Sequence, residues 1–283
     1  MSVEFDQAVE AFRKGDLEEA RAFAEAEMSA APSPDVQHLL GLIHCRLGDP
    51  ASGVEYLIQA ADAQPENAGF QIMLMRALID IGRADEVLQM PEPPAIRSAA
   101  ALELWRARAE AADAVTRTDV SIEAWSKIAD AAPADWRAWA NLGNAYATAQ
   151  AWSEAAVALS KAAALNPGEL TVQRNAGSAF LQLNQPENAI RHLTAVVGAQ
   201  PKLVEDRILL ARALAWAQRH DEAIGEFESA RRLGGSTFEI EFGIGQSHSA
   251  KMRFVEAEAA LERAYMLEPT NRAAVFNFGV VLD

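Results

Sequence analysis

A period of 34 residues runs along the chain and constrains its fold more than any other feature. Two sets of residues are separated by multiples of 34 positions. The glycines are Gly41, Gly143, Gly177, Gly245 and Gly279, and the prolines are Pro65, Pro133, Pro167, Pro201 and Pro269. A fixed period of this size is typical of proteins built from stacked repeats, each of which packs on its neighbours. Apolar residues within each copy follow helical and not alternating spacing, so the period predicts an all-α repeat array.

The clearest copy spans residues 136–169 and reads "WRAWANLGNAYATAQAWSEAAVALSKAAALNPGE". With its first residue as position 1, it carries Trp139 at 4, Leu142 at 7, Gly143 at 8, Tyr146 at 11, Ala155 at 20, Leu159 at 24, Ala162 at 27 and Pro167 at 32. This pattern resembles the tetratricopeptide repeat, or TPR. The resemblance implies a TPR-like α-solenoid of antiparallel helix pairs that forms a right-handed superhelix.

The resemblance covers the whole chain, so we predict a single TPR array over residues 1–283. Its copies are 1–33, 34–67, 68–101, 102–135, 136–169, 170–203, 204–237 and 238–271, followed by a partial copy at 272–283. Small residues at positions 8, 20 and 27 would let the helices approach closely, and the proline at position 32 would end the second helix of each copy.

The stretch "VLQMPEPPAIRS", which contains Pro91, Pro93 and Pro94, interrupts this regularity because proline is not tolerated inside a helix. The repeat count nevertheless passes through it unchanged. We therefore predict an irregular second helix over residues 87–101 within one array. It would consist of a short helix from Ala84 to Met90, an extended segment at residues 91–94, and a new helix from Ala95.

The copy that follows the prolines is degenerate. It has Arg108 at position 7, and Thr116 and Ser121 replace the turn glycine and the small alanine, although Trp105 and Trp125 are kept. Together with the proline segment, this copy is the predicted site of distortion in the array.

Composition excludes several functional classes. The formal charge of −15 opposes binding to nucleic acid and to anionic membranes. No apolar run is long enough for a membrane helix, and the amino terminus lacks the pattern of a secretory signal. With Cys45 as its single cysteine, the chain suits a reducing cytoplasm, and its alanine- and arginine-rich composition suits a bacterial source.

No arrangement of residues in the sequence indicates catalysis, a metal or a cofactor, so we expect a protein that is not an enzyme. His44 and His248 both fall on packing position 11, and the carboxylates near positions 16–21 recur where second helices begin. The tryptophans fit packing positions 4, 13 and 24. The glycines of "RLGGSTFEI" lack the lysine of a phosphate-binding loop.

The resemblance to TPR proteins implies that the first helices line a concave groove, mainly through positions 2, 5, 6, 9, 12 and 13. These positions are apolar in the copies from 34 and 68 and polar in the copies from 136, 170 and 204. The predicted peptide-binding residues are Arg137, Asn141, Asn144, Arg174, Asn175, Ser178 and Arg212. Asparagine could pair with a peptide backbone, and arginine with carboxylates.

The alternative is that these are solvated groove residues without a ligand. Binding of a chaperone tail is not supported, because Asn144 and Asn175 match the family's carboxylate clamp while each of its cations is missing.

The function that we predict is a non-catalytic scaffold that binds a peptide segment of a partner protein. The last copy stops after its first helix and presents Phe276, Val280 and Val281. We expect either that the natural chain continues or that this apolar end forms a homodimer. In the alternative function, the array is the amino-terminal, substrate-recruiting region of a larger enzyme of the glycosyltransferase or sulfotransferase type.

Overall fold

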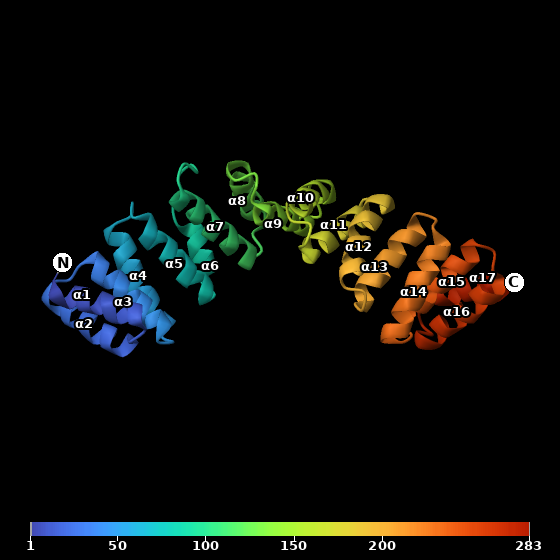
Figure 1. The fold of residues 1–283 in the computed structure, drawn as a ribbon, viewed down its shortest axis with the longest axis horizontal. Coiled ribbons are helices and arrows are strands. Elements are labelled where there is room, and N and C mark those ends of the chain that lie inside the picture. Colours follow the sequence, from blue (N-terminus) through green and yellow to red (C-terminus); the bar gives the residue numbers. More distant parts are fainter. Residues whose placement is uncertain (1, 283) are drawn as a thin grey trace. The chain divides into compact units, whose positions relative to one another are not determined.

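The computed structural model describes residues 2–282, with side chains as far as Val280, and these residues form helices without any strand (Figure 1). The contacts divide the chain into two compact units, residues 1–133 (unit 1) and 134–283 (unit 2). Unit 1 holds α1 (Val3–Lys14), α2 (Leu17–Ala30), α3 (Pro34–Arg46), α4 (Pro50–Ala63), α5 (Ala68–Asp80), α6 (Ala84–Gln89), α7 (Ala99–Ala114) and α8 (Thr118–Ala131).

Unit 2 holds α9 (Trp136–Thr148), α10 (Trp152–Leu165), α11 (Leu170–Gln182), α12 (Pro186–Ala199), α13 (Val204–Trp216), α14 (His220–Gly234), α15 (Phe238–Ala250), α16 (Phe254–Leu267) and α17 (Arg272–Leu282). Within each unit, every helix packs on the next one along the chain (Figure 1). The all-α solenoid of helix pairs is therefore confirmed, whereas the single array stays a prediction.

The predicted packing of small residues is confirmed. A Cβ added at Gly143, Gly177 or Gly245 would lie 2.6–2.7 Å from the Cγ of the leucine sixteen residues later, so only glycine allows the second helix to approach this closely. The alanines at position 20 are fully buried, as are those at position 27; they are Ala155, Ala189, Ala223 and Ala257, and Ala60, Ala162, Ala230 and Ala264. These contacts hold each helix pair together.

The turn between the two helices of a repeat places position 15 in the left-handed region. Glycine fills it in the early copies, as at Gly48 and Gly82, whose φ angles are 84° and 78°. Later copies use other residues with φ angles of 53–61°, namely Thr116, Gln150, Asn184, Gln218 and Met252. The geometry of the turn is thus kept where the glycine is lost, at the cost of a strained backbone.

The proline segment lies inside unit 1 and does not mark the boundary between the units. The predicted short helix is present as α6, but the prediction of a new helix from Ala95 was wrong. That helix, α7, begins at Ala99, because the Ser98 side chain accepts a hydrogen bond from the backbone N–H of Ala101 and caps it. The non-helical segment is therefore longer than the prolines alone predict.

Side chains of the degenerate copy hold this segment in place. The Trp105 indole Nε1 donates to the Pro94 carbonyl over 2.9 Å, and Lys127 pairs with Glu92 at 2.8 Å. The Arg108 guanidinium donates to the carbonyls of Val87, Leu88 and Met90 over 3.4–3.5 Å. These carbonyls lie at the carboxyl-terminal end of α6, in its last turn and in the flanking Met90, where helix carbonyls lack intrahelical partners; the Val87 carbonyl also accepts from the backbone N–H of Met90. Arg108 therefore acts as a cap for α6, which explains its presence at a packing position.

A half-buried histidine in α3 makes stability depend on pH. His38 stacks on Phe70 with 4.6 Å between ring centroids, and burial lowers the pKa of His38 below 6.5, with partial opposition from Asp35. Below pH 6.5 the unfolded chain takes up a proton that the folded state resists, so the contribution of His38 to stability is lost as the pH falls.

We therefore expect His38→Phe, which keeps the stacking, to lose less stability than the unchanged protein between about pH 7.5 and pH 5.5. Urea unfolding at the two pH values measures this difference. His192 and His248, whose pKa values are also lowered by burial, contribute equally in both proteins. An equal loss in the two proteins would show that His38 is not the responsible group.

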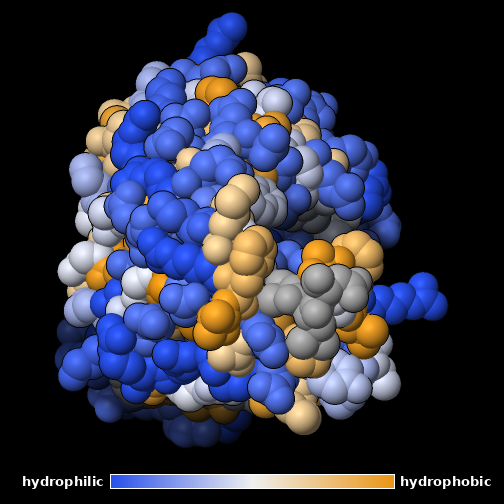
Figure 2. All heavy atoms as spheres, turned by 90° about the vertical axis from the view of Figure 1, so that its right-hand side faces the viewer, coloured by the Kyte–Doolittle hydropathy of each residue, from blue (hydrophilic) through white to orange (hydrophobic). Residues whose placement is uncertain are grey.

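The carboxyl-terminal end of unit 2 exposes apolar side chains, visible as orange atoms in Figure 2. In α17, Phe276 is 70% exposed and Val280 58%, and α16 adds Val255 at 78%. The predicted contribution of Val281 falls outside the described side chains. A patch of this kind is typical of a packing surface, which is in line with the expected homodimer. The homodimer itself stays a prediction.

Candidate functional site

The first helices of unit 2 form one continuous face. Helix α11 contacts α9 and α13, and α13 contacts α15, whereas among the described residues no comparable contact joins one second helix to the next. The first helices are therefore closer together and lie on the inner side of this unit. The predicted binding residues belong to three of them, with Arg137, Asn141 and Asn144 on α9, Arg174, Asn175 and Ser178 on α11, and Arg212 on α13.

Two of the predicted asparagines meet across neighbouring helices. The Asn175 Nδ2 donates to the Asn144 Oδ1 over 2.9 Å. This bond leaves the Asn144 Nδ2 as a donor and the Asn175 Oδ1 as an acceptor, because a side-chain amide has two N–H groups and two oxygen lone pairs. A peptide bond presents the complementary pair, a carbonyl and an N–H. Asn144 and Asn175 are therefore arranged in a way that could clamp an extended backbone.

The three predicted arginines have different environments. Arg174 forms a two-bond ion pair with Asp206 of α13, through Nε to Oδ1 and through Nη2 to Oδ2 at 2.7 Å. The Asp206 side chain is 1% exposed, and its hydrogen bonds raise the pKa of Arg174. Arg174 therefore neutralises a buried charge of its own chain, and sequence reasoning could not anticipate this partner.

Arg212 and Arg137 are more accessible. Arg212 reaches Glu239 only at 3.5 Å and is 41% exposed, so this surface ion pair is weak. Arg137 is exposed and lies over the Trp136 ring, 4.7 Å from the centroid. Both guanidinium groups remain open to a carboxylate.

Asn141 and Ser178 complete the predicted set. Both are half-buried, and neither side chain makes a hydrogen bond to the part of the chain that the structure describes. The structure thus joins Asn144 and Asn175 directly and gives Arg174 a structural partner.

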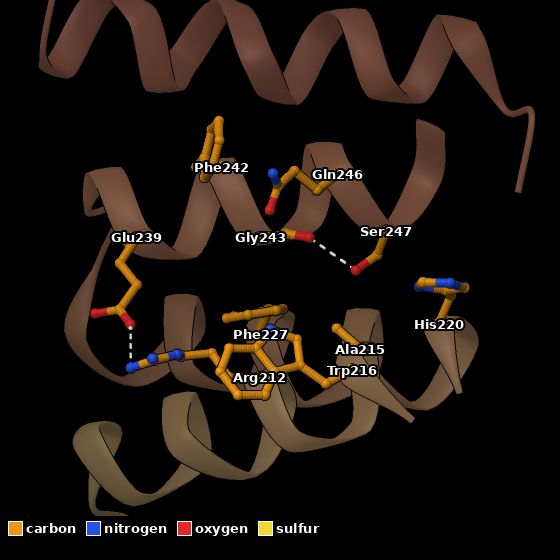
Figure 3. A pocket seen from close by; sticks show the side chains of 10 residues that line it. All are labelled: Arg212, Ala215, Trp216, His220, Phe227, Glu239, Phe242, Gly243, Gln246 and Ser247. Carbon is orange, nitrogen blue, oxygen red and sulfur yellow. Dashed lines mark hydrogen bonds and ion pairs between the residues drawn. The ribbon is translucent and has the colours of Figure 1, made fainter. Parts of the chain in front are cut away.

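A pocket of about 320 Å³ opens on the same inner face, between α13, α14 and α15 (Figure 3). Its lining includes Arg212 and Trp216 of α13 together with Phe242, Gly243 and Gln246 of α15. Position 13 was predicted both to pack and to line the groove; Trp216 at this position is 47% exposed and lines the pocket, so the packing interpretation was wrong for it. The α15 residues occupy groove positions 5, 6 and 9, so reading the same positions one copy further along the sequence would have found them.

The inner face of unit 1 is more apolar, as the sequence predicts for the early copies. A pocket of about 310 Å³ is lined there mainly by apolar residues such as Leu42 and Met73, together with Cys45, Arg76 and Asp80. Burial raises the pKa of the Cys45 thiol, which keeps it protonated.

Known proteins share this helical architecture. Residues 174–237, from α11 to α14, match a family model described as tetratricopeptide repeat. Among solved structures, YrrB, a TPR protein described as having an unusual peptide-binding site, has a TM-score of 0.58 and 18% identity over 68% of this chain and 96% of its own. The fold is that of the tetratricopeptide-repeat proteins.

Other TPR-like structures agree. MamA from Desulfovibrio magneticus RS-1 has a TM-score of 0.54 and 19% identity, covering 60% of this chain and 97% of its own. MamA MSR-1 has a TM-score of 0.54 and 23% identity over 59% and 97% of the two chains. Among curated proteins, none matches the sequence. At these identities the likeness concerns the fold and not the ligand.

Metal-binding clusters and membrane-spanning helices are both absent from the described part of this TPR fold. Among residues 2–282, no group of three or more histidine, cysteine, aspartate and glutamate side chains could hold a metal ion. None of the described helices combines the length and the apolar character needed to cross a membrane.

Proposed function

We propose that the chain is a non-catalytic scaffold that binds an extended peptide segment of a partner protein along the inner face of α9, α11, α13 and α15. The observation that carries this proposal is the pair formed by Asn144 and Asn175. Its remaining donor and acceptor complement a peptide bond whatever the neighbouring side chains are. Because main-chain recognition tolerates different sequences, specificity must come from other positions of the groove.

Charges at the groove support a peptide with an acidic group. Arg137 and Arg212 remain accessible and carry positive charge in a chain whose net charge is −15. They could therefore pair with an acidic group of the peptide. YrrB, which shares the fold, is described as having a peptide-binding site. Phosphate-rich partners such as nucleic acid are disfavoured by the net charge of −15.

We also propose that the protein acts in a bacterial cytoplasm. A single, half-buried Cys45 with a protonated thiol is compatible with a reducing bacterial cytoplasm. The role as a substrate-recruiting region of a larger enzyme stays a prediction from the sequence.

A random-peptide display library selected against the full chain tests the proposal. Peptides that bind are then titrated by fluorescence anisotropy against Asn144→Ala/Asn175→Ala. Loss of two backbone hydrogen bonds should weaken binding by about tenfold or more. The matched control is Asn188→Ala on the second helix α12, which should leave the affinity unchanged.

Circular dichroism checks that the double variant keeps its helical content. Selected peptides whose affinity is the same for the double variant and the unchanged protein would exclude the asparagine pair as the binding element. Failure to select any peptide would contradict the scaffold proposal itself.

A further inference from the structure

The pocket between α13 and α15 has the features of a site for one side chain. Its volume of about 320 Å³ is large enough for an aromatic side chain but not for a folded segment. Figure 3 shows Phe242 and Trp216 on opposite sides, with Phe227 between them and His220 at one end. Because the pocket belongs to the inner face on which the peptide is proposed to bind, its role as a subsite for that peptide rests on the proposed function.

A glycine opens the pocket down to its floor. A Cβ added at Gly243 would lie 2.3–2.8 Å from three ring atoms of Phe227, a residue that is 1% exposed. At the same position 6, the other first helices of unit 2 carry Asn141, Asn175, Leu209 and Asn277. On α15, the glycine lets the surface between neighbouring first helices reach down to the Phe227 ring of the second helix.

The walls of the pocket favour a flat, apolar ring. Trp216 is 47% exposed and Phe242 is half-buried, so part of each ring is accessible from the groove, although Phe238 stacks on Phe242 and the Arg212 guanidinium lies over the Trp216 ring. Aromatic rings attract one another in offset-stacked or edge-to-face arrangements, which a branched aliphatic side chain cannot adopt. The pocket therefore selects for aromatic over aliphatic occupants.

We propose that this pocket binds an aromatic side chain of the bound peptide. The ring lies between Trp216 and Phe242 over the floor made by Phe227 and Gly243. The anchor sets the register of the peptide, and the asparagine pair on α9 and α11 holds its backbone.

The peptides selected from the random library, used as the probe, test this proposal directly. They should share one aromatic residue. Replacing that residue by leucine should weaken binding about tenfold to the unchanged protein but much less to Trp216→Ala, because that variant lacks one of the rings on which the residue packs. Selected peptides without a common aromatic residue would overturn the proposal while leaving the backbone clamp intact.

Variants of the walls give an independent measurement. Phe242→Ala and Trp216→Ala should each weaken binding about tenfold and remove the preference for an aromatic residue. Phe254→Ala, which changes an exposed phenylalanine of α16 outside the pocket, is the matched control and should have no effect. Since Trp216 is an exposed residue, its variant is informative even if Phe242→Ala fails to fold.

The two levels of the hypothesis fail in different ways. If the library yields no binding peptide, the proposed function is wrong and the anchor with it. If peptides bind, respond to Asn144→Ala/Asn175→Ala and ignore both wall variants, the groove binds peptides and the aromatic anchor alone is wrong.

Discussion

Replacing Arg174 by alanine is expected to lower the free energy of unfolding by about 3 kcal/mol, at the lower end of the range for breaking a buried ion pair. The cause is Asp206, whose side chain is 1% exposed and would lose both hydrogen bonds to the guanidinium. Arg174 itself is 33% exposed, so water can reach part of the space that it leaves, which limits the loss. Urea unfolding followed by circular dichroism measures the change.

Two controls identify the buried charge as the cause. The double variant Arg174→Leu/Asp206→Leu removes both charges and should recover most of the stability, since buried ion pairs are often replaceable by apolar residues. Arg137→Ala, on the same face but without a buried partner, should change stability by less than about 0.5 kcal/mol. A loss for Arg174→Ala no larger than that for Arg137→Ala would contradict the structural role.

Two glycines of one repeat should respond in opposite directions to the same substitution. Gly177→Ala places a Cβ 2.7 Å from the Cγ of the fully buried Leu193, so α11 and α12 must move apart. We expect a net loss of about 1–2 kcal/mol, because overpacking outweighs the higher helix propensity of alanine.

Gly198→Ala, in the helical, exposed part of α12, meets no atom within 4 Å. It should gain up to about 1 kcal/mol from helix propensity alone. Parallel urea titrations compare the two variants. Stabilisation by both would show that the close contact with Leu193 adapts at no cost.

The regular part of the fold could be predicted from the sequence because each repeat satisfies the same local rules. The first helices from α3 to α17, with the exception of α7, begin at the first residue of a predicted copy. The proline segment differs because proline excludes a helix at its own position but does not determine where the next helix begins. The start of α7 depends on the Ser98 cap and on the contacts of Trp105 and Arg108. In the repeat pattern, these residues only mark the copy as degenerate.

The candidate site was predictable to a smaller extent. Asn144 and Asn175 could be placed together because the family's groove positions lie on adjacent helices. The pairing of Arg174 with Asp206 could not, since position 3 is not a groove position and its burial depends on the angle between α11 and α13. The pocket near Gly243 requires knowing where the Phe227 ring lies, and a sequence pattern does not give the orientation of a ring.

The cap that Arg108 provides for α6 has a consequence for evolution and protein engineering. Repeat proteins are commonly treated as modular, with any copy exchangeable for a consensus copy. Here the copy at 68–101 depends on side chains of the copy at 102–135 to satisfy its helix end. The smallest interchangeable module in this part of the chain is therefore a pair of repeats, and a duplication or deletion that separated them would leave one half without its cap.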